Sequence, residues 1–170
     1  MVDQLAAAQA RLKQGSEGLR WSPPESWHIT LQFLGETSAE RCACVIAQLR
    51  RVNAAAVRIV IEEPGSFSKT GVVFAAVART PALLALQQHV TAATARCGVI
   101  AESRPFTPHI TLARAPGRAQ AGNRAAMQKQ MGALAGFSPC TAREFVLYES
   151  FPEAAGARYL VRERFPLKGR

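Results

Sequence analysis

Apolar residues recur with helical spacing in four stretches of this chain, and in six others they alternate with polar residues or gather in short β-branched runs. The helical spacing predicts helices over residues 3–14, 37–52, 80–97 and 118–134. Thr37 with Glu40 forms a capping-box pattern at the start of the second helix, and Thr80 followed by Pro81 suits the start of the third. Gly98 is placed to end that third helix.

The strand-like stretches are residues 27–34, 57–61, 72–78, 109–113, 142–150 and 157–164. In the first stretch, apolar and polar side chains face opposite ways: Trp27, Ile29, Leu31 and Phe33 against His28, Thr30 and Gln32. Pro64 and Gly65 predict a turn after the second stretch, so we expect the strands at 57–61 and 72–78 to pair. Helices and strands that interleave in this way indicate an α+β protein.

Length and composition indicate a folded protein. A chain of 170 residues fits a single domain, and 48% hydrophobic with 19% charged residues is far from the composition of a disordered chain. No apolar run approaches the roughly 20 residues of a membrane helix, and the N-terminus lacks the apolar core of a signal peptide. We therefore expect a cytoplasmic protein with no membrane partner.

Charge is the first unusual property, because 21 Lys and Arg residues stand against 12 Asp and Glu, for a formal net charge of +9. Such a surface favours phosphate-rich partners. A proteome that prefers Arg on solvated faces would give the same balance, and only Lys13, Lys69 and Lys129 are lysines. The charge is therefore consistent with a nucleic-acid partner without requiring one.

The four cysteines are Cys42, Cys44, Cys97 and Cys140, and none of them forms a Cys-x-x-Cys pair. Cys42 and Cys44 are two positions apart in a predicted helix, where their side chains diverge. We expect all four to be reduced, small apolar residues, and we expect no zinc site.

The tetrapeptide His-Ile-Thr-Leu occurs twice, at residues 28–31 and 109–112, about half the chain apart. Each copy follows a proline-containing stretch, which suggests two related lobes. In each copy the Thr lies two residues after the His, so the imidazole and the hydroxyl project from the same face of a strand. A free imidazole titrates near pH 6.5, so a facing pair can supply one neutral base and one charged acid.

Sequence around these motifs also follows a known family: Arg20-Trp21 and Phe33-Leu34-Gly35 near the first His, Arg104-Pro105-Phe106 and Leu112-Ala113-Arg114 near the second, Pro81-Ala82-Leu83 between them, and Gly156-Ala157-Arg158-Tyr159 near the end. The chain resembles the 2H phosphoesterase superfamily, named for two His-x-Thr-x motifs. It is most similar to the bacterial and archaeal RNA 2',3'-cyclic phosphodiesterase branch, also called 2'-5' RNA ligase.

The resemblance implies a fold of two pseudo-symmetric lobes within one domain over residues 1–170. Each lobe would be an antiparallel sheet with outer helices and would carry one motif, with the active-site groove between the lobes. It also implies an enzyme without metal or cofactor that hydrolyses 2',3'-cyclic phosphate ends of RNA to 2'-phosphomonoesters. The reverse reaction would be 2'-5' RNA ligation. We expect the partner to be RNA or a small nucleotide, and the protein to be a monomer.

The same resemblance assigns roles to five residues. His28 would protonate the departing 3' oxygen and His109 would activate water, although the sequence itself does not distinguish the two parts. Thr30 and Thr111 would bind the non-bridging phosphate oxygens. Arg114 would contact phosphate or the nucleotide end, but strict alternation places it on the face opposite His109, so a bulge or a strand end is needed.

Several departures and alternatives stay open. Thr107 stands where the family often has a basic residue, and the short apolar strand that usually precedes the first helix is missing. His89 has no partner in its predicted helix and is expected to be solvated or to pack. The same fold acting on another cyclic phosphate or on a 2'-5' nucleotide linkage is an alternative, as is a non-catalytic module that binds RNA or nucleotides.

Overall fold

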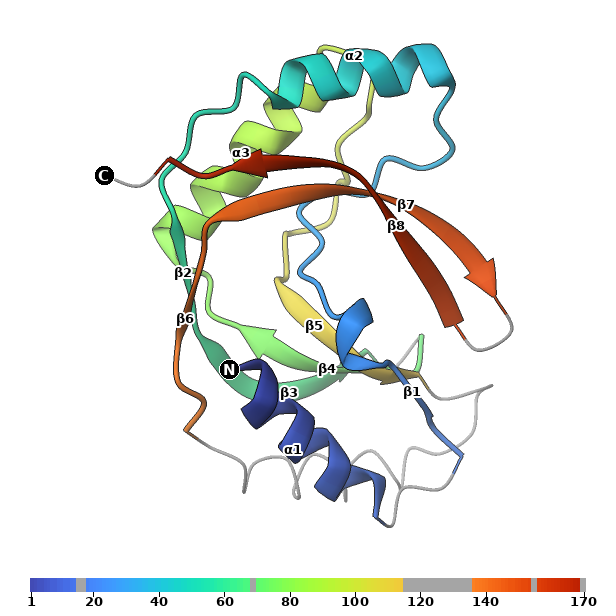
Figure 1. The fold of residues 1–170 in the computed structure, drawn as a ribbon, viewed down its shortest axis with the longest axis vertical. Coiled ribbons are helices and arrows are strands. Elements are labelled where there is room, and N and C mark those ends of the chain that lie inside the picture. Colours follow the sequence, from blue (N-terminus) through green and yellow to red (C-terminus); the bar gives the residue numbers. More distant parts are fainter. Residues whose placement is uncertain (15–17, 68–69, 115–135, 154–155, 169–170) are drawn as a thin grey trace.

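The structure is a computed structural model, and it describes residues 1–14, 18–67, 70–114, 136–153 and 156–168 (Figure 1). Its helices are α1 (Val2–Lys13), the short 3-10 helix η1 (Pro24–Ser26), α2 (Ala39–Leu49) and α3 (Pro81–Ala95). Its strands are β1 (Arg20–Trp21), β2 (Val57–Ile59), β3 (Ile61–Phe67), β4 (Val72–Val77), β5 (His109–Arg114), β6 (Cys140–Ala142), β7 (Glu144–Glu153) and β8 (Gly156–Pro166). The expected α+β class is confirmed.

All strand pairs in the described part of the chain are antiparallel. Four strands form one sheet in the order β1-β5-β4-β3, and β2–β6 and β7–β8 form two further pairs. Figure 1 shows α2 and α3 together at one end of the molecule and α1 at the other, with the long β7–β8 hairpin arching between them. The two-lobe description stays a prediction.

One cluster of buried apolar side chains runs through these elements. It includes residues from α1, α2, α3 and the sheets. Strand β5 contributes Ile110, Leu112 and Ala113, which are 5%, 1% and 0% exposed. The strand that carries the second His-Ile-Thr-Leu motif is therefore anchored by its apolar residues, and burial of the Ile110 and Leu112 side chains is worth about 1.5–3 kcal/mol each.

The helix predictions are largely confirmed. Helix α1 matches the expected range, and Thr80 caps α3 by accepting a hydrogen bond from the Leu83 N–H at 3.3 Å. The cap of α2 is Ser38, whose hydroxyl accepts from the Arg41 N–H, so the expected Thr37 cap is wrong by one residue. The helix expected over residues 118–134 lies outside the described residues.

The strand expected over residues 27–34 is wrong. Within this segment only Ile29 pairs, through a single antiparallel bridge to Ile110, and the backbone bends at Leu31. Strand β5 is already paired with β4 on one edge, and β1 occupies the other edge at Ala113 and Arg114, which leaves little of that edge open. Phe33, expected on the apolar face, is 69% exposed.

The pairing expected between residues 57–61 and 72–78 is partly wrong. Strand β2 pairs with β6, and it is β3 that pairs with β4. Pro64 and Gly65 lie within β3 rather than in a turn. Because β3 is an edge strand of its sheet, a proline without an N–H is tolerated there, beside the register shift that follows Ile61.

The expectation that all cysteines are reduced is wrong for two of them. Cys44 in α2 and Cys97, just after α3, form a disulfide with a Cα–Cα distance of 5.9 Å. Sequence spacing did not indicate this bond, because the two residues are 53 positions apart and meet only through the packing of α2 on α3. Cys42 and Cys140 are half-buried thiols.

Thiol titration of the unfolded protein tests this bond. Without reductant we expect two reactive thiols, from Cys42 and Cys140, and after reduction all four. Reduction should also lower the melting temperature, since a cross-link closing a loop of this length is worth on the order of 4 kcal/mol in the chain-entropy description. Four reactive thiols before reduction would contradict the disulfide.

Candidate active site

The bridge between Ile29 and Ile110 brings the two His-Ile-Thr-Leu motifs side by side. Ile110 is buried in the apolar cluster and Ile29 is half-buried against it, so both side chains face the core. Alternation along β5 turns His109 and Thr111 the other way, and the antiparallel bridge at Ile29 turns its neighbours His28 and Thr30 to that same side. The face opposite the core therefore carries His28, Thr30, His109 and Thr111 together.

Antiparallel register also decides which of these residues are neighbours. Counting outward from the bridge places His28 across from Thr111 and Thr30 across from His109. Residues directly opposite in an antiparallel pair have Cβ atoms about 4.5–5.5 Å apart. In this register, each imidazole faces the position of the other motif's threonine.

Both imidazoles are oriented in the same way by their own backbone. His28 Nδ1 lies 2.8 Å from the Ser26 carbonyl oxygen, and His109 Nδ1 lies 2.7 Å from the Thr107 carbonyl oxygen. A carbonyl can only accept, so each Nδ1 donates its proton. In the neutral ring this leaves Nε2 with a free lone pair, ready to accept or to donate a proton after protonation.

A bulge in β5 brings Arg114 to the motif face. Phe74 of β4 pairs with Thr111, but its neighbour Val73 pairs with Ala113, so Leu112 is an extra residue in β5. Leu112 and Ala113 are both buried, and Arg114 is exposed. The bulge reverses the alternation and returns Arg114 to the side of Thr111. This is the geometry that the sequence required for Arg114 to reach the site.

The bulge is held by hydrogen bonds to its backbone. The Leu112 carbonyl accepts from the Ser22 N–H at 2.8 Å and from the Gln9 Nε2 amide at 3.3 Å. Gln9 also donates to the Ser22 carbonyl at 2.7 Å, and its side chain is only 3% exposed. Helix α1 thereby ties the bulge to the segment that leads into the first motif. Sequence reasoning assigned nothing to Gln9.

Aromatic rings flank each histidine, and they differ in kind. Tyr159 of β8 meets the His28 ring edge-on at 4.7 Å between centroids, and Tyr148 of β7 lies at 6.0 Å. Phe67 and Phe74, from β3 and β4, each lie 5.1 Å from the His109 ring. The tyrosines were not among the residues predicted for the site: Tyr159 lies in a stretch that matches the family, but nothing in the sequence places it beside His28, and no motif includes Tyr148.

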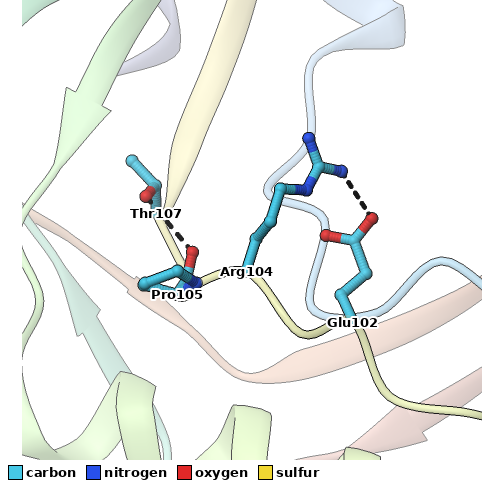
Figure 2. Close-up of polar contacts among 4 residues, drawn as sticks. All are labelled: Glu102, Arg104, Pro105 and Thr107. Atoms are coloured by element: carbon cyan, nitrogen blue, oxygen red, sulfur yellow. Dashed lines mark hydrogen bonds and ion pairs between the residues drawn. The ribbon is translucent and has the colours of Figure 1, made fainter.

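The loop leading into β5 is shown in Figure 2. Arg104 forms an ion pair with Glu102 at 2.7 Å, and the Thr107 hydroxyl donates to the Pro105 carbonyl at 3.4 Å. Exposed pairs of this kind are worth about 0–1 kcal/mol, and both side chains are mostly exposed. Thr107 contributes to the site through its backbone carbonyl, which orients His109.

Among the described residues, no group of three or more His, Cys, Asp or Glu side chains is placed to hold a metal ion. No helix in that part of the chain has the length and apolar character needed to cross a membrane. His89 is exposed on α3, as expected for a solvated residue. Two imidazoles with free Nε2 atoms, two hydroxyls and one guanidinium on one face can together move protons and bind an anion.

Comparison with known proteins identifies the family of this chain. A sequence model of the 2'-5' RNA ligase superfamily matches residues 2–150. The RNA 2',3'-cyclic phosphodiesterase of Escherichia coli (strain K12) is 32% identical over 91 residues, which is 53% of this chain and 52% of that protein. The match therefore spans only about half the length of that relative.

Two crystal structures share the fold over nearly the whole chain. Escherichia coli LigT in its apo form has a TM-score of 0.75 and 26% identity, covering 98% of this chain and 90% of LigT. TT0787 of Thermus thermophilus has a TM-score of 0.74 and 27% identity, covering 99% of this chain and 92% of that one. The expected 2H phosphoesterase fold is thus confirmed.

A substitution at Gly65 tests whether Phe74 supports the His109 ring. Gly65 pairs with Phe74, and a Cβ at Gly65 would lie 2.5 Å from Phe74 Cζ, so Gly65→Ala must displace the ring that contacts His109. We expect a lower melting temperature and a shift of the His109 imidazole NMR signals, which feel the ring current. The control is Glu63→Ala, an exposed position on the same strand. Unmoved His109 signals in Gly65→Ala would contradict this support.

Proposed function

Because this chain belongs to the 2'-5' RNA ligase superfamily, we propose that it is an RNA 2',3'-cyclic phosphodiesterase that opens the cyclic phosphate to a 2'-phosphomonoester. One observation supports the proposal most: the Ile29–Ile110 bridge joins the two motifs, and in each motif the histidine Nδ1 is held by a backbone carbonyl two residues before it. The relative named RNA 2',3'-cyclic phosphodiesterase supports the substrate class.

The reaction needs one proton taken and one proton given. Water attacks phosphorus as His109 Nε2 removes its proton, and a new P–O bond forms. The bond from phosphorus to the 3' oxygen breaks, and protonated His28 Nε2 supplies the proton to that oxygen. The product keeps its phosphate on the 2' oxygen. Exchange with solvent restores both imidazoles to their starting states.

Charge that accumulates on the non-bridging oxygens is stabilised from the same face. The hydroxyls of Thr30 and Thr111 donate hydrogen bonds to these oxygens, and the Arg114 guanidinium adds a positive charge. These residues act in place of a metal ion. If a 5'-hydroxyl replaces water as the nucleophile, the same groups form a 2'-5' linkage, which is the proposed ligase activity.

The protein is proposed to act as a monomer, without metal, on RNA ends or small nucleotides. The cytoplasmic location expected from the sequence also stays a prediction, and the Cys44–Cys97 disulfide is unusual for a cytosolic protein. A second enzymatic candidate is another cyclic phosphate substrate, since every group above acts on the phosphate and the ribose oxygens. A binding module without turnover would not need two imidazoles with matched orientation.

Replacement of either histidine tests the mechanism. With EDTA present, the wild type should convert a short RNA ending in a 2',3'-cyclic phosphate to the 2'-phosphate. His28→Ala and His109→Ala should each lose at least about 100-fold in kcat/KM, the usual range for a general acid or base. His89→Ala is the matched control and should leave the rate unchanged. Retention of the rate in either active-site variant, or its loss with EDTA, would contradict the mechanism.

The pH dependence separates the two roles. The base must be neutral and the acid protonated, so kcat/KM should rise and then fall with increasing pH. Residual activity of His109→Ala should lack the rise, and residual activity of His28→Ala should lack the fall. The opposite pattern would exchange the two roles, and an unchanged profile in one variant would remove that histidine from proton transfer.

A further inference from the structure

The β7–β8 hairpin presents two tyrosines on one face. Tyr148 pairs with Val161, and Ser150 pairs with Tyr159, so the two tyrosines are diagonal neighbours across the strands. Their ring centroids are 5.9 Å apart. Tyr148 is 40% exposed and Tyr159 is half-buried, so the pair offers aromatic surface that the protein itself does not cover.

This tyrosine pair lies against one histidine only. Tyr159 contacts the His28 ring at 4.7 Å, and Tyr148 lies behind it at 6.0 Å. The ring contacts of His109, in contrast, come from two phenylalanines of the four-stranded sheet. Any ligand whose phosphate sits at His28 therefore has the tyrosine pair as its nearest aromatic neighbour.

The aromatic pair on the other side offers less surface. Phe74 is 7% exposed, and its ring fills the space that a Cβ of Gly65 would need. Phe67 is half-buried and packs on Phe74 at 4.4 Å between centroids. Among these four rings, the exposed one is Tyr148, so the larger aromatic surface lies on the His28 side.

We propose that Tyr148 and Tyr159 form the binding site for the nucleobase of the nucleotide that carries the cyclic phosphate. This inference rests on the proposed function and adds to it the side on which the nucleoside lies. In a nucleoside 2',3'-cyclic phosphate the base is attached to the ribose carbon next to the one bearing the 2' oxygen, so a phosphate held at the motif face brings the base close. Aromatic side chains stack on all four bases, so little base preference is expected.

The experiment compares two substrates that differ only in the base. Adenosine 2',3'-cyclic phosphate is set against methyl riboside 2',3'-cyclic phosphate, which keeps the ribose and the phosphate. Tyr148→Ala should reduce kcat/KM for the adenosine substrate by about 5- to 100-fold, mainly through KM, the range found for loss of one base-stacking ring. The methyl riboside should be affected less than about 2-fold. Tyr148→Phe, which keeps the ring, should stay close to wild type on both.

Two outcomes would overturn the inference. Equal losses on both substrates would mean that Tyr148 acts on His28 or on the fold, and equal losses in Tyr148→Phe and Tyr148→Ala would mean that the hydroxyl matters rather than the ring. Leu160→Ala is the matched control, because Leu160 is 43% exposed and adjoins Tyr159 on the other face of β8. It should leave both substrates unchanged.

Failure of the proposed function would be visible separately. If the wild type hydrolyses neither of these substrates nor the short RNA with a 2',3'-cyclic phosphate end, the phosphodiesterase proposal is wrong. Calorimetric binding of adenosine 2'-monophosphate then decides the inference by itself. Tyr148→Ala should weaken that binding by about 5- to 100-fold and leave binding of inorganic phosphate unchanged. Equal binding of the nucleotide by wild type and Tyr148→Ala would refute the tyrosine site.

Discussion

The geometry of the candidate site depends on a single antiparallel contact between two isoleucines. Ile110 is buried and Ile29 is half-buried against the same apolar cluster, because apolar side chains leave water, and extended antiparallel pairing then turns the residues on either side of each to the opposite face. Packing of the two isoleucines against the core thus determines the face on which the neighbouring histidines and threonines lie. A substitution that shifted this register by one residue would bury an imidazole and expose an isoleucine.

A second constraint decides whether Arg114 lies on the same face as the two motifs. In an unbroken strand Arg114 would point away from His109, and the extra residue Leu112 corrects this. The carbonyl of Leu112 accepts from the Ser22 N–H, which continues the pairing of β1 with β5, and from the buried Gln9 amide. Through Gln9, helix α1 therefore holds the backbone of the bulge that precedes Arg114.

Features that depend on residues close together in the sequence could be predicted, and features that depend on distant residues could not. Local patterns succeeded: Thr80 caps a helix because its hydroxyl needs only a backbone N–H three residues away. Properties set by distant partners were missed. Pro64 lies in a strand because β4 pairs with it, Cys97 is oxidised because two helices pack, and Tyr148 reaches the site because a hairpin folds over it. Arg114 was predicted in part. Strand alternation showed that Arg114 needs a bulge to lie on the face of His109, but it did not show that a bulge forms.

The central claim is that His28 and His109 act on opposite sides of one phosphorus atom. A crystal structure with a nucleoside 2',3'-cyclic vanadate, which mimics the five-coordinate transition state, tests this most directly. The account predicts His28 Nε2 and His109 Nε2 each within about 3 Å of a different apical oxygen, with the hydroxyls of Thr30 and Thr111 on the equatorial oxygens. Both imidazoles on the same apical oxygen, or either one without contact to the vanadate, would contradict it.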